Sequence, residues 1–456
     1  MSRDLVPGHL TSGHVPGPGP RTGRCGTGLG TRSQGMAGVG LAAVDGGGNA
    51  GSRAPRHGPA AVGRLLRHRN FGPYFVGNAC SASGAWFQNL ASAVLIYRLT
   101  HSTVLLGVLQ FAQFGPILLL APWTGAAADR FDRRRLLLTT QAAQTTLTAA
   151  LSAFAFAGLA TEQVVLGFSF VLGILTAFAL PAQQALIASL VDRDDLPSAV
   201  ALNSMTYNVA RAIGPSLAAI FIAAFGVAAA FAVNSVSYLV LAAAVLIVRP
   251  RPQERAASSR LRESLQLIRR EPRLAVYLLI VAVVGFASDP VNALAPAFAH
   301  EFGHAPTVGG FLLGVFGAGA VTAAFVVAGR TAGTRPRMVA TLGLLSFGMI
   351  LFSLTPWLPL ALVFLFAAGF GYLASNTSAT SRLQLEVSET QRGRIMALWG
   401  IAFLGVRPLA SLVDGAIASA AGVRVAGVVL ALPALTVALV IGASALRARA
   451  SSPSAA

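Results

Sequence analysis

The sequence contains no lysine and little charge of either sign. Charged residues make up 11% of its 456 residues, whereas 54% are hydrophobic. A soluble domain carries roughly 25% charged residues, so the composition predicts a membrane protein. The only two cysteines, Cys25 and Cys80, are too few for a disulfide framework.

Acidic residues are scarcer than basic ones, at 16 against 34, and the formal net charge is +18. A nucleic-acid-binding protein gathers its basic residues on one folded face. Here the arginines flank apolar runs instead. The excess of positive charge therefore predicts an orientation in a lipid bilayer, and no nucleic-acid partner is expected.

The apolar runs are long enough to cross a bilayer, which takes about 20 residues. The sequence predicts twelve such spans, and hence an all-α membrane protein. Their bounds are 73–97, 104–124, 135–158, 163–186, 200–223, 228–248, 274–298, 308–329, 337–355, 359–380, 395–418 and 425–446.

Arginine is distributed unequally between the two sets of connecting loops. One set, together with the C-terminal tail, holds 21 arginines, whereas the other set holds only Arg98 and Arg424. Since cytoplasmic loops collect basic residues, both termini are expected in the cytoplasm. The expected parts are a disordered tail 1–60, a six-helix bundle 61–248, a linker 249–272, a second bundle 273–446 and a tail 447–456.

The two halves repeat weakly but in order. A shift of 204 residues aligns Gly125 with Gly329, and a shift of 196 aligns Arg211 with Arg407 and Gly226 with Gly422. Two parallel six-span repeats are one transporter architecture.

Two stretches carry a resemblance to a known family. The segment GAAADRFDRRR, residues 125–135, resembles the loop signature of the major facilitator superfamily. The segment 181–218, which ends in RAIGPSLA, is similar to the exporter branch that includes enterobactin and macrolide efflux proteins. The resemblance covers about residues 64–446. It implies the major facilitator fold, with two pseudo-symmetric six-helix bundles.

The first stretch is a candidate conformational latch. Asp129 follows the second span, where the helix dipole disfavours a carboxylate, so a partner is expected. The resemblance suggests either an arginine of the same loop or the start of span 11. In the second half Gly333 replaces the acid. A purely topological charge cluster is the alternative. The predicted latch residues are Gly125, Asp129, Arg130, Arg133 and Arg134.

Four charges fall in the interior of the predicted spans, where charges are expensive and usually functional. Asp289 and Asp414 are the candidates for carrying a proton, although Asp289 also fits a cap on the kink at Pro290 and Asp414 a structural role. Arg211 and Arg407 are suited either to an anionic substrate or to backbone carbonyls.

The resemblance places further residues. Gly214 and Pro215 fit the helix-bend motif of the family's antiporters, because proline removes a backbone donor, although Ala218 and Ala219 replace the motif's trailing glycines. Spans 1, 4, 7 and 10 line the family's central cavity. The cavity candidates are Asn78, Ser81, Trp86, Asn89, Asn292 and Asn376.

One motif favours a different class. Residues 300–304, HEFGH, match a zinc-protease pattern that needs both histidines on one helical turn. Gly303 within the motif, Pro306 after it and the lack of an evident third ligand disfavour an enzyme. The sequence contains no P-loop, and no metal or cofactor is expected.

The predicted function is proton-coupled export of a small organic molecule by alternating access. The predicted partners are that substrate, protons and lipid, and the expected form is a monomer in the plasma membrane of a bacterium. A proton-coupled uptake symporter and a non-transporting membrane sensor are the alternatives.

The arginine distribution generates a test of topology. With Cys25 and Cys80 replaced by serine, a cysteine introduced at Ser258 is expected to be shielded in intact cells from a membrane-impermeant thiol reagent. A cysteine at Thr161 is expected to react, because it lies in an arginine-poor loop. The reverse labelling pattern would overturn the predicted orientation.

Overall fold

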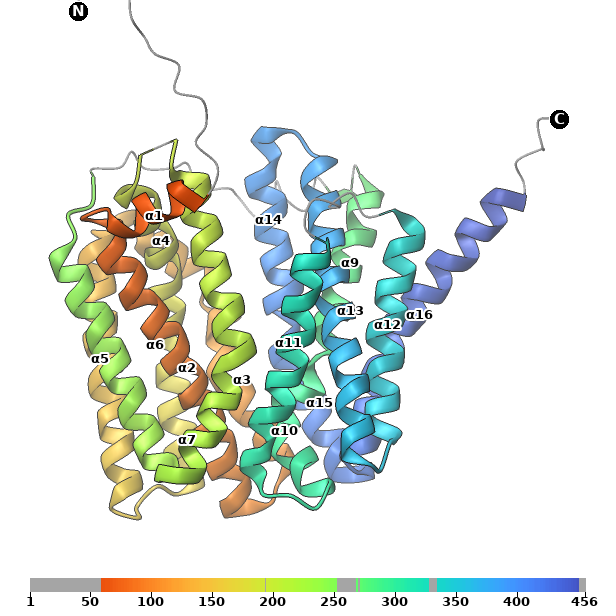
Figure 1. The fold of residues 1–456 in the computed structure, drawn as a ribbon, viewed down its shortest axis with the longest axis horizontal. Coiled ribbons are helices and arrows are strands. Elements are labelled where there is room, and N and C mark those ends of the chain that lie inside the picture. Colours follow the sequence, from red (N-terminus) through yellow and green to blue (C-terminus); the bar gives the residue numbers. More distant parts are fainter. Residues whose placement is uncertain (1–58, 193, 252–267, 270, 328–333, 451–456) are drawn as a thin grey trace, which may run out of the picture. The chain divides into compact units, whose positions relative to one another are not determined.

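The computed structural model describes residues 59–192, 194–251, 268–269, 271–327 and 334–450, and every regular element among them is a helix. The predicted tail up to residue 58 and most of the predicted linker lie outside these ranges. Within the unit 55–456, Figure 1 shows the helices before residue 248 on the left and those after residue 271 on the right.

The first half contains seven helices among its described residues. They are α1 (Pro59–Arg67), α2 (Phe71–Thr100), α3 (Thr103–Leu119), α4 (Ala121–Arg130), α5 (Arg133–Phe156), α6 (Glu162–Leu190) and α7 (Leu196–Ile247).

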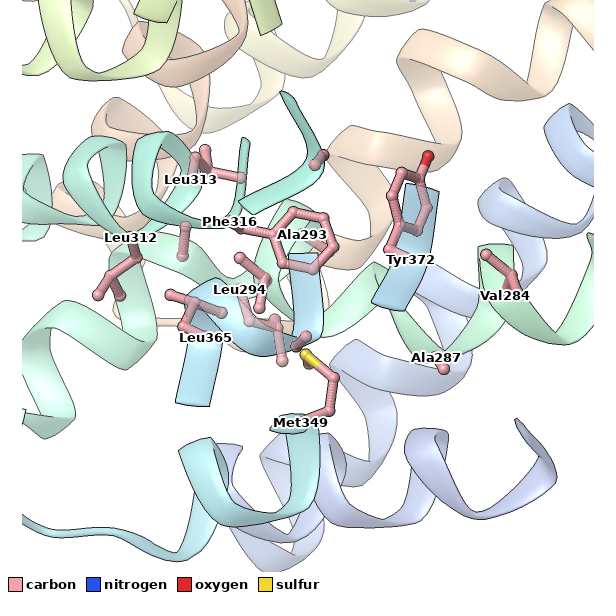
Figure 2. Close-up of a cluster of buried hydrophobic side chains, with 14 of the residues drawn as sticks. Val284, Ala287, Ala293, Leu294, Leu312, Leu313, Phe316, Met349, Leu365 and Tyr372 are labelled. Atoms are coloured by element: carbon pink, nitrogen blue, oxygen red, sulfur yellow. The ribbon is translucent and has the colours of Figure 1, made fainter. Parts of the chain in front are cut away.

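The second half contains α9 (Pro272–Ala287), α10 (Asp289–Glu301), a short 3-10 turn η1 (Pro306–Val308), α11 (Gly309–Val327), α12 (Arg335–Leu354), α13 (Leu358–Leu385), α14 (Glu389–Leu404), α15 (Val406–Ala421) and α16 (Val423–Ala450). Buried apolar side chains of this half pack as Figure 2 shows, with Phe316 near Leu294 and Ala293.

Eight of the described helices are long and apolar enough to cross a membrane, and the bent pair α3 and α4 makes a ninth candidate. The 52 residues of α7 contain two crossings, because the backbone turns at Gly226. Both α2 and α5 are long enough, but buried polar side chains such as Gln88 and Gln141 lower their hydropathy. This arrangement is consistent with the twelve predicted spans.

Three of the predicted spans are interrupted, which the apolar runs did not reveal. The second span bends by 56° between α3 and α4, where Pro116 and Pro122 each lack a backbone donor. The seventh span breaks at Ser288 and the eleventh at Gly405. Proline follows each of these two breaks, within the first turn of the new helix, where it is tolerated.

The repeat is visible in the backbone. Gly226 and Gly422, which the shift of 196 residues aligns, both have positive φ, with φ/ψ of 84/172° and 96/155°. Each joins two consecutive spans at a turn without a loop. Glycine fits there because it has no Cβ to clash in this conformation.

The two halves meet along two helix pairs, α3 with α15 and α7 with α11. Small residues allow the close approach. A Cβ on Gly107 would overlap the carbonyl oxygen of Ser411, and one on Gly317 would lie 2.6 Å from the Cα of Ala212. The hydroxyl of Thr103 donates to the carbonyl of Gly415 at 3.2 Å.

Candidate functional site

A cavity of about 360 Å³ lies between the two halves, within the range typical of small-molecule sites. Its walls come from α2, α3, α5, α6 and α7 of the first half and from α10, α11, α14 and α15 of the second. Five of the six cavity candidates line it: Asn78, Ser81, Trp86, Asn89 and Asn292. The sixth, Asn376, is not among the lining residues, and no described residue donates to its buried Oδ1.

The cavity is accessible from the end of the bundle at which α2 begins, and we call this the near end. Tyr207 of α7, a helix that begins at the near end, lines the cavity on that side and is 41% exposed. At the opposite end, the far end, Leu90 and Ala295 form its floor and are 2% and 1% exposed. Figure 1 shows α1 and the end of α16 on the side of the near end.

Rings from both halves close the far end. The rings of Tyr97 and His101 from the first half contact the ring of His300 from the second, with centroid separations of 5.8 Å in both cases. The Thr103–Gly415 hydrogen bond lies at the same end. The structure therefore has one closed end and one accessible end.

Amide side chains hold the first-half wall in place. The Asn78 amide donates to Asn203 at 2.7 Å and accepts from Gln183 at 3.2 Å. Gln144 donates to the hydroxyl of Thr176 at 3.0 Å. These bonds tie α2, α6 and α7 together, and α5 to α6, because buried polar groups need partners.

An ion pair occupies the second-half wall. The Arg407 Nε lies 3.7 Å from the Asp289 Oδ1, and the two side chains are 17% and 2% exposed. Asp289 follows the break at Ser288, and Arg407 follows the break at Gly405. The two interrupted spans thus present opposite charges to each other. Asp289 is the first residue of α10, and the preceding N-cap residue, Ser288, makes no side-chain cap hydrogen bond.

Asp414 is fully buried in α15, and no described residue donates a hydrogen bond to either of its carboxylate oxygens. It does not line the cavity. Arg407 pairs with Asp289 from the neighbouring span, and no contact between Arg407 and Asp414 is found among the described residues.

The repeat-related arginines both reach across the interface between the halves. Arg211 in α7 lies over the ring of Tyr372 in α13, 4.7 Å from its centroid. Arg407 in α15 lies over the ring of Phe114 in α3, at 5.9 Å. Both arginines line the cavity. Stacking of this kind stabilises a cation without using its hydrogen-bond donors.

The helix-bend motif lies at the same interface. Pro215 is inside α7, and a Cβ on Gly310 of α11 would overlap its carbonyl oxygen. A Cβ on Gly214 would lie 3.0 Å from Trp86, a cavity residue. The motif therefore connects the cavity wall with the packing between the halves.

The predicted latch residues lie at the near end. Arg134 donates to the carbonyls of Val245 and Leu246 at 3.0 and 2.6 Å. Gly125 and Arg130 belong to α4, and Arg133 begins α5. The Asp129 side chain lies outside the described part of the chain, so its partner stays a prediction.

Two ion pairs at the near end were not predicted. Arg64 of α1 binds Asp195 at 2.8 Å, and Arg251 pairs with Asp192. The Arg251 guanidinium holds the pKa of the exposed Asp192 carboxyl below its ordinary value. That pair is present above the ordinary Asp range and is lost as the pH falls through the lowered pKa. The partners of each pair are far apart in the sequence, by 131 and 59 residues, so no local pattern predicted either contact.

The zinc-protease motif does not form its helix. The helix α10 ends at Glu301, and Gly303 has a φ of 77°, so His300 and His304 do not share a helical turn. Glu301 instead binds Arg424 at 3.0 Å. The geometry that the motif requires is absent from this segment.

Sequence reasoning missed several polar cavity residues. The sequence feature that could have identified them is an amide, hydroxyl or phenol group inside an otherwise apolar run. They are Gln110, Gln141, Gln144, Thr176, Gln183, Tyr207 and Tyr238.

Comparison with known families agrees with this geometry. The transmembrane secretion effector model of the major facilitator superfamily matches residues 64–455. The chain belongs to this family. It is a multi-pass membrane transporter, and its fold is the all-α major facilitator fold.

Two relatives of this chain are exporters by name, and a third is a transporter by name. The enterobactin exporter EntS of Shigella boydii is 27% identical over 81% of this chain and 92% of its own length. Macrolide efflux protein A of Enterococcus faecalis is 26% identical over 47% of this chain and 72% of its own length. The staphyloferrin A transporter of Staphylococcus aureus is 31% identical over 37% of this chain. The matched stretch spans only 42% of that protein, and 61% of the Bacillus subtilis transporter YfiS.

The fold is shared with solved transporters. A bacterial homolog of the human lysosomal transporter Spinster, in an inward-facing and occupied conformation, superposes with a TM-score of 0.67. The two chains are 16% identical, and the match covers 85% of this chain and 97% of that one. At this identity the likeness concerns the fold alone.

The ion pair generates a prediction on stability. Arg407→Gln is expected to lower the free energy of unfolding by about 3 kcal/mol, because it strands the buried Asp289 carboxylate. Asp289→Asn is expected to have a smaller effect, since Arg407 is partly exposed to the cavity. Thermal unfolding of the purified protein in detergent measures both effects.

The double variant provides the control. Asp289→Asn combined with Arg407→Gln is expected to be more stable than Arg407→Gln alone. Strict additivity of the two single effects would mean that the two side chains do not interact.

Proposed function

We propose that this transporter exports a small organic molecule from the cell in exchange for protons, by alternating access to the central cavity. The observation that carries the proposal is a buried acid, Asp289, that pairs with an arginine of the cavity wall. An ionisable group inside a membrane protein usually serves a pathway for ions or protons.

The direction of transport is supported by two observations. Two relatives named above, the enterobactin exporter and macrolide efflux protein A, have names that indicate transport out of the cell. The near end carries the arginine-rich connections, which the positive-inside rule assigns to the cytoplasm. In that orientation the cavity is open to the cytoplasm, the state in which an exporter takes up its cargo. Both termini are then cytoplasmic, in the plasma membrane of a bacterium.

In the proposed cycle the two halves move as bundles, 61–248 against 273–446, and the protein acts as a monomer. Cargo enters from the near end. The contacts of His300 with Tyr97 and His101 must then separate for cargo to leave at the far end. Only interactions that differ between the two states shift such an equilibrium.

The proton is proposed to return on Asp289. A proton on this carboxyl removes its charge, and with it the attraction that holds Arg407 against α10. The ion pair therefore exists in one protonation state and not in the other. Because the pair joins the two broken spans, the state of Asp289 affects how α10 and α15 sit against each other. Asp414, buried nearby without a donor, is the second candidate for a proton site.

Coupling can be tested on Asp289. Mass spectrometry of the medium from cells with and without the transporter first identifies a compound whose release depends on it. In inside-out vesicles, an inward-acidic gradient is expected to drive accumulation of that compound, and a protonophore is expected to stop it. Asp289→Asn is expected to show neither effect.

Glu162→Gln is the matched control, because Glu162 is a partly exposed acid at the start of α6, outside the cavity. Full gradient-driven accumulation by Asp289→Asn would move the proton site elsewhere, and Asp414→Asn would be the next variant. Accumulation driven by the opposite gradient would identify an uptake symporter. A wild-type protein that ignores the gradient would refute proton coupling.

The latch of Gly125, Asp129, Arg130, Arg133 and Arg134 is proposed to hold the near end shut in the opposite state. Asp129→Asn keeps the size and removes the charge. Transport is expected to fall several-fold at equal membrane abundance, since a coupling term is typically ~1–3 kcal/mol. An unchanged transport rate would leave only the topological role.

A further inference from the structure

The charges around the cavity do not cancel. Two arginines line it, Arg211 and Arg407, and none of the lining residues is acidic. Asp289 neutralises Arg407 from behind. One positive charge, on Arg211, is left facing the cavity without a counter-ion among the described residues.

Arg211 is held in place by stacking rather than by hydrogen bonds. Its guanidinium lies 4.7 Å from the centre of the Tyr372 ring, so its flat face is covered. Its Nη2 is buried, and no described residue accepts a hydrogen bond from it. Of the two roles open to a buried arginine, satisfying backbone carbonyls is not seen here. An unpaired buried donor is costly, more so on a charged group.

We infer that Arg211 binds the anionic group of the cargo, and that the cargo is a small organic anion. This rests on the proposed function, in that the cavity is taken to be the cargo site. A carboxylate is the simplest match, because a guanidinium can donate two parallel hydrogen bonds to it. A guanidinium already stacked on a ring retains those donors.

The other lining residues of the cavity indicate which kind of molecular body the anionic group is attached to. Trp86, Phe114 and Leu313 provide apolar walls, and Gln110 and Asn89 provide neutral donors and acceptors. An anion with an apolar or aromatic body fits these walls. A cationic molecule meets uncompensated positive charge instead.

The two arginines therefore have different proposed roles. Arg407 is bound to Asp289 and belongs to the proposed proton site, whereas Arg211 is free for cargo. The separation has an energetic consequence. An inside-negative membrane potential drives an anion outward and a proton inward, so both legs of the exchange run downhill electrically.

Three probes of one shape test the inference on the purified full-length protein in detergent, by titration calorimetry. They are 2-naphthoate, the neutral 2-naphthamide and the cationic 2-naphthylmethylamine. Naphthoate is expected to bind about ten-fold or more tightly than the amide, the effect of one charged hydrogen bond, and the amine is not expected to compete. Arg211→Gln is expected to abolish this preference, and Arg211→Lys to keep part of it.

Arg98→Gln is the matched control, because Arg98 is an exposed arginine near the end of α2, outside the cavity. Equal affinity of the wild type for naphthoate and the amide, or no saturable binding of naphthoate, would overturn the inference. So would full naphthoate affinity in a folded Arg211→Gln protein. If Arg211→Gln does not fold, the affinities of the wild type and of Arg211→Lys for the three probes still test the inference. No gradient is present, so failure of antiport leaves this result unaffected.

Discussion

Asp289 and Arg407 face each other because two membrane-spanning segments are interrupted where the two residues begin new helices. Two isolated charges would be expensive at this depth, whereas a pair with one member open to a cavity is tolerated. The cavity wall, the helix breaks and the ion pair therefore depend on one another. If the seventh and eleventh spans were continuous, the side chains that follow the breaks would leave at different angles.

The interface between the halves is built from the opposite kind of chemistry. Glycines along α3 and α11 let neighbouring backbones approach closely, and van der Waals packing is joined by neutral hydrogen bonds such as that of Thr103 with Gly415. Contacts of this kind separate without leaving unpaired charges. The arginine–ring contacts of Arg211 and Arg407 cross the same interface. The ring contacts themselves do not use the guanidinium donors, so they link the halves without occupying the cavity's binding groups.

The pseudo-symmetry of the chain is kept in its backbone and broken in its chemistry. Gly226 and Gly422 have the same conformation, and the aligned arginines occupy equivalent positions across the interface. Of these two arginines, only Arg407 pairs with an acid among the described residues. The charge of Arg407 in the second half is thus neutralised, whereas that of Arg211 in the first half is not. The two halves therefore contribute different charges to one cavity.

The sequence alone determined the membrane class, the spans, the repeat and the family, because hydropathy and composition are local sums that need no knowledge of neighbours. It also placed most of the cavity candidates, since residues that share a helical face stay together in any packing. Tertiary structure decided the rest. The partner of Arg407, the exclusion of Asn376 from the cavity and the separation of His300 from His304 depend on where helices break and how they rotate against one another. Those choices are made by contacts between residues far apart in the chain, such as Asp289 with Arg407, and no local pattern encodes them.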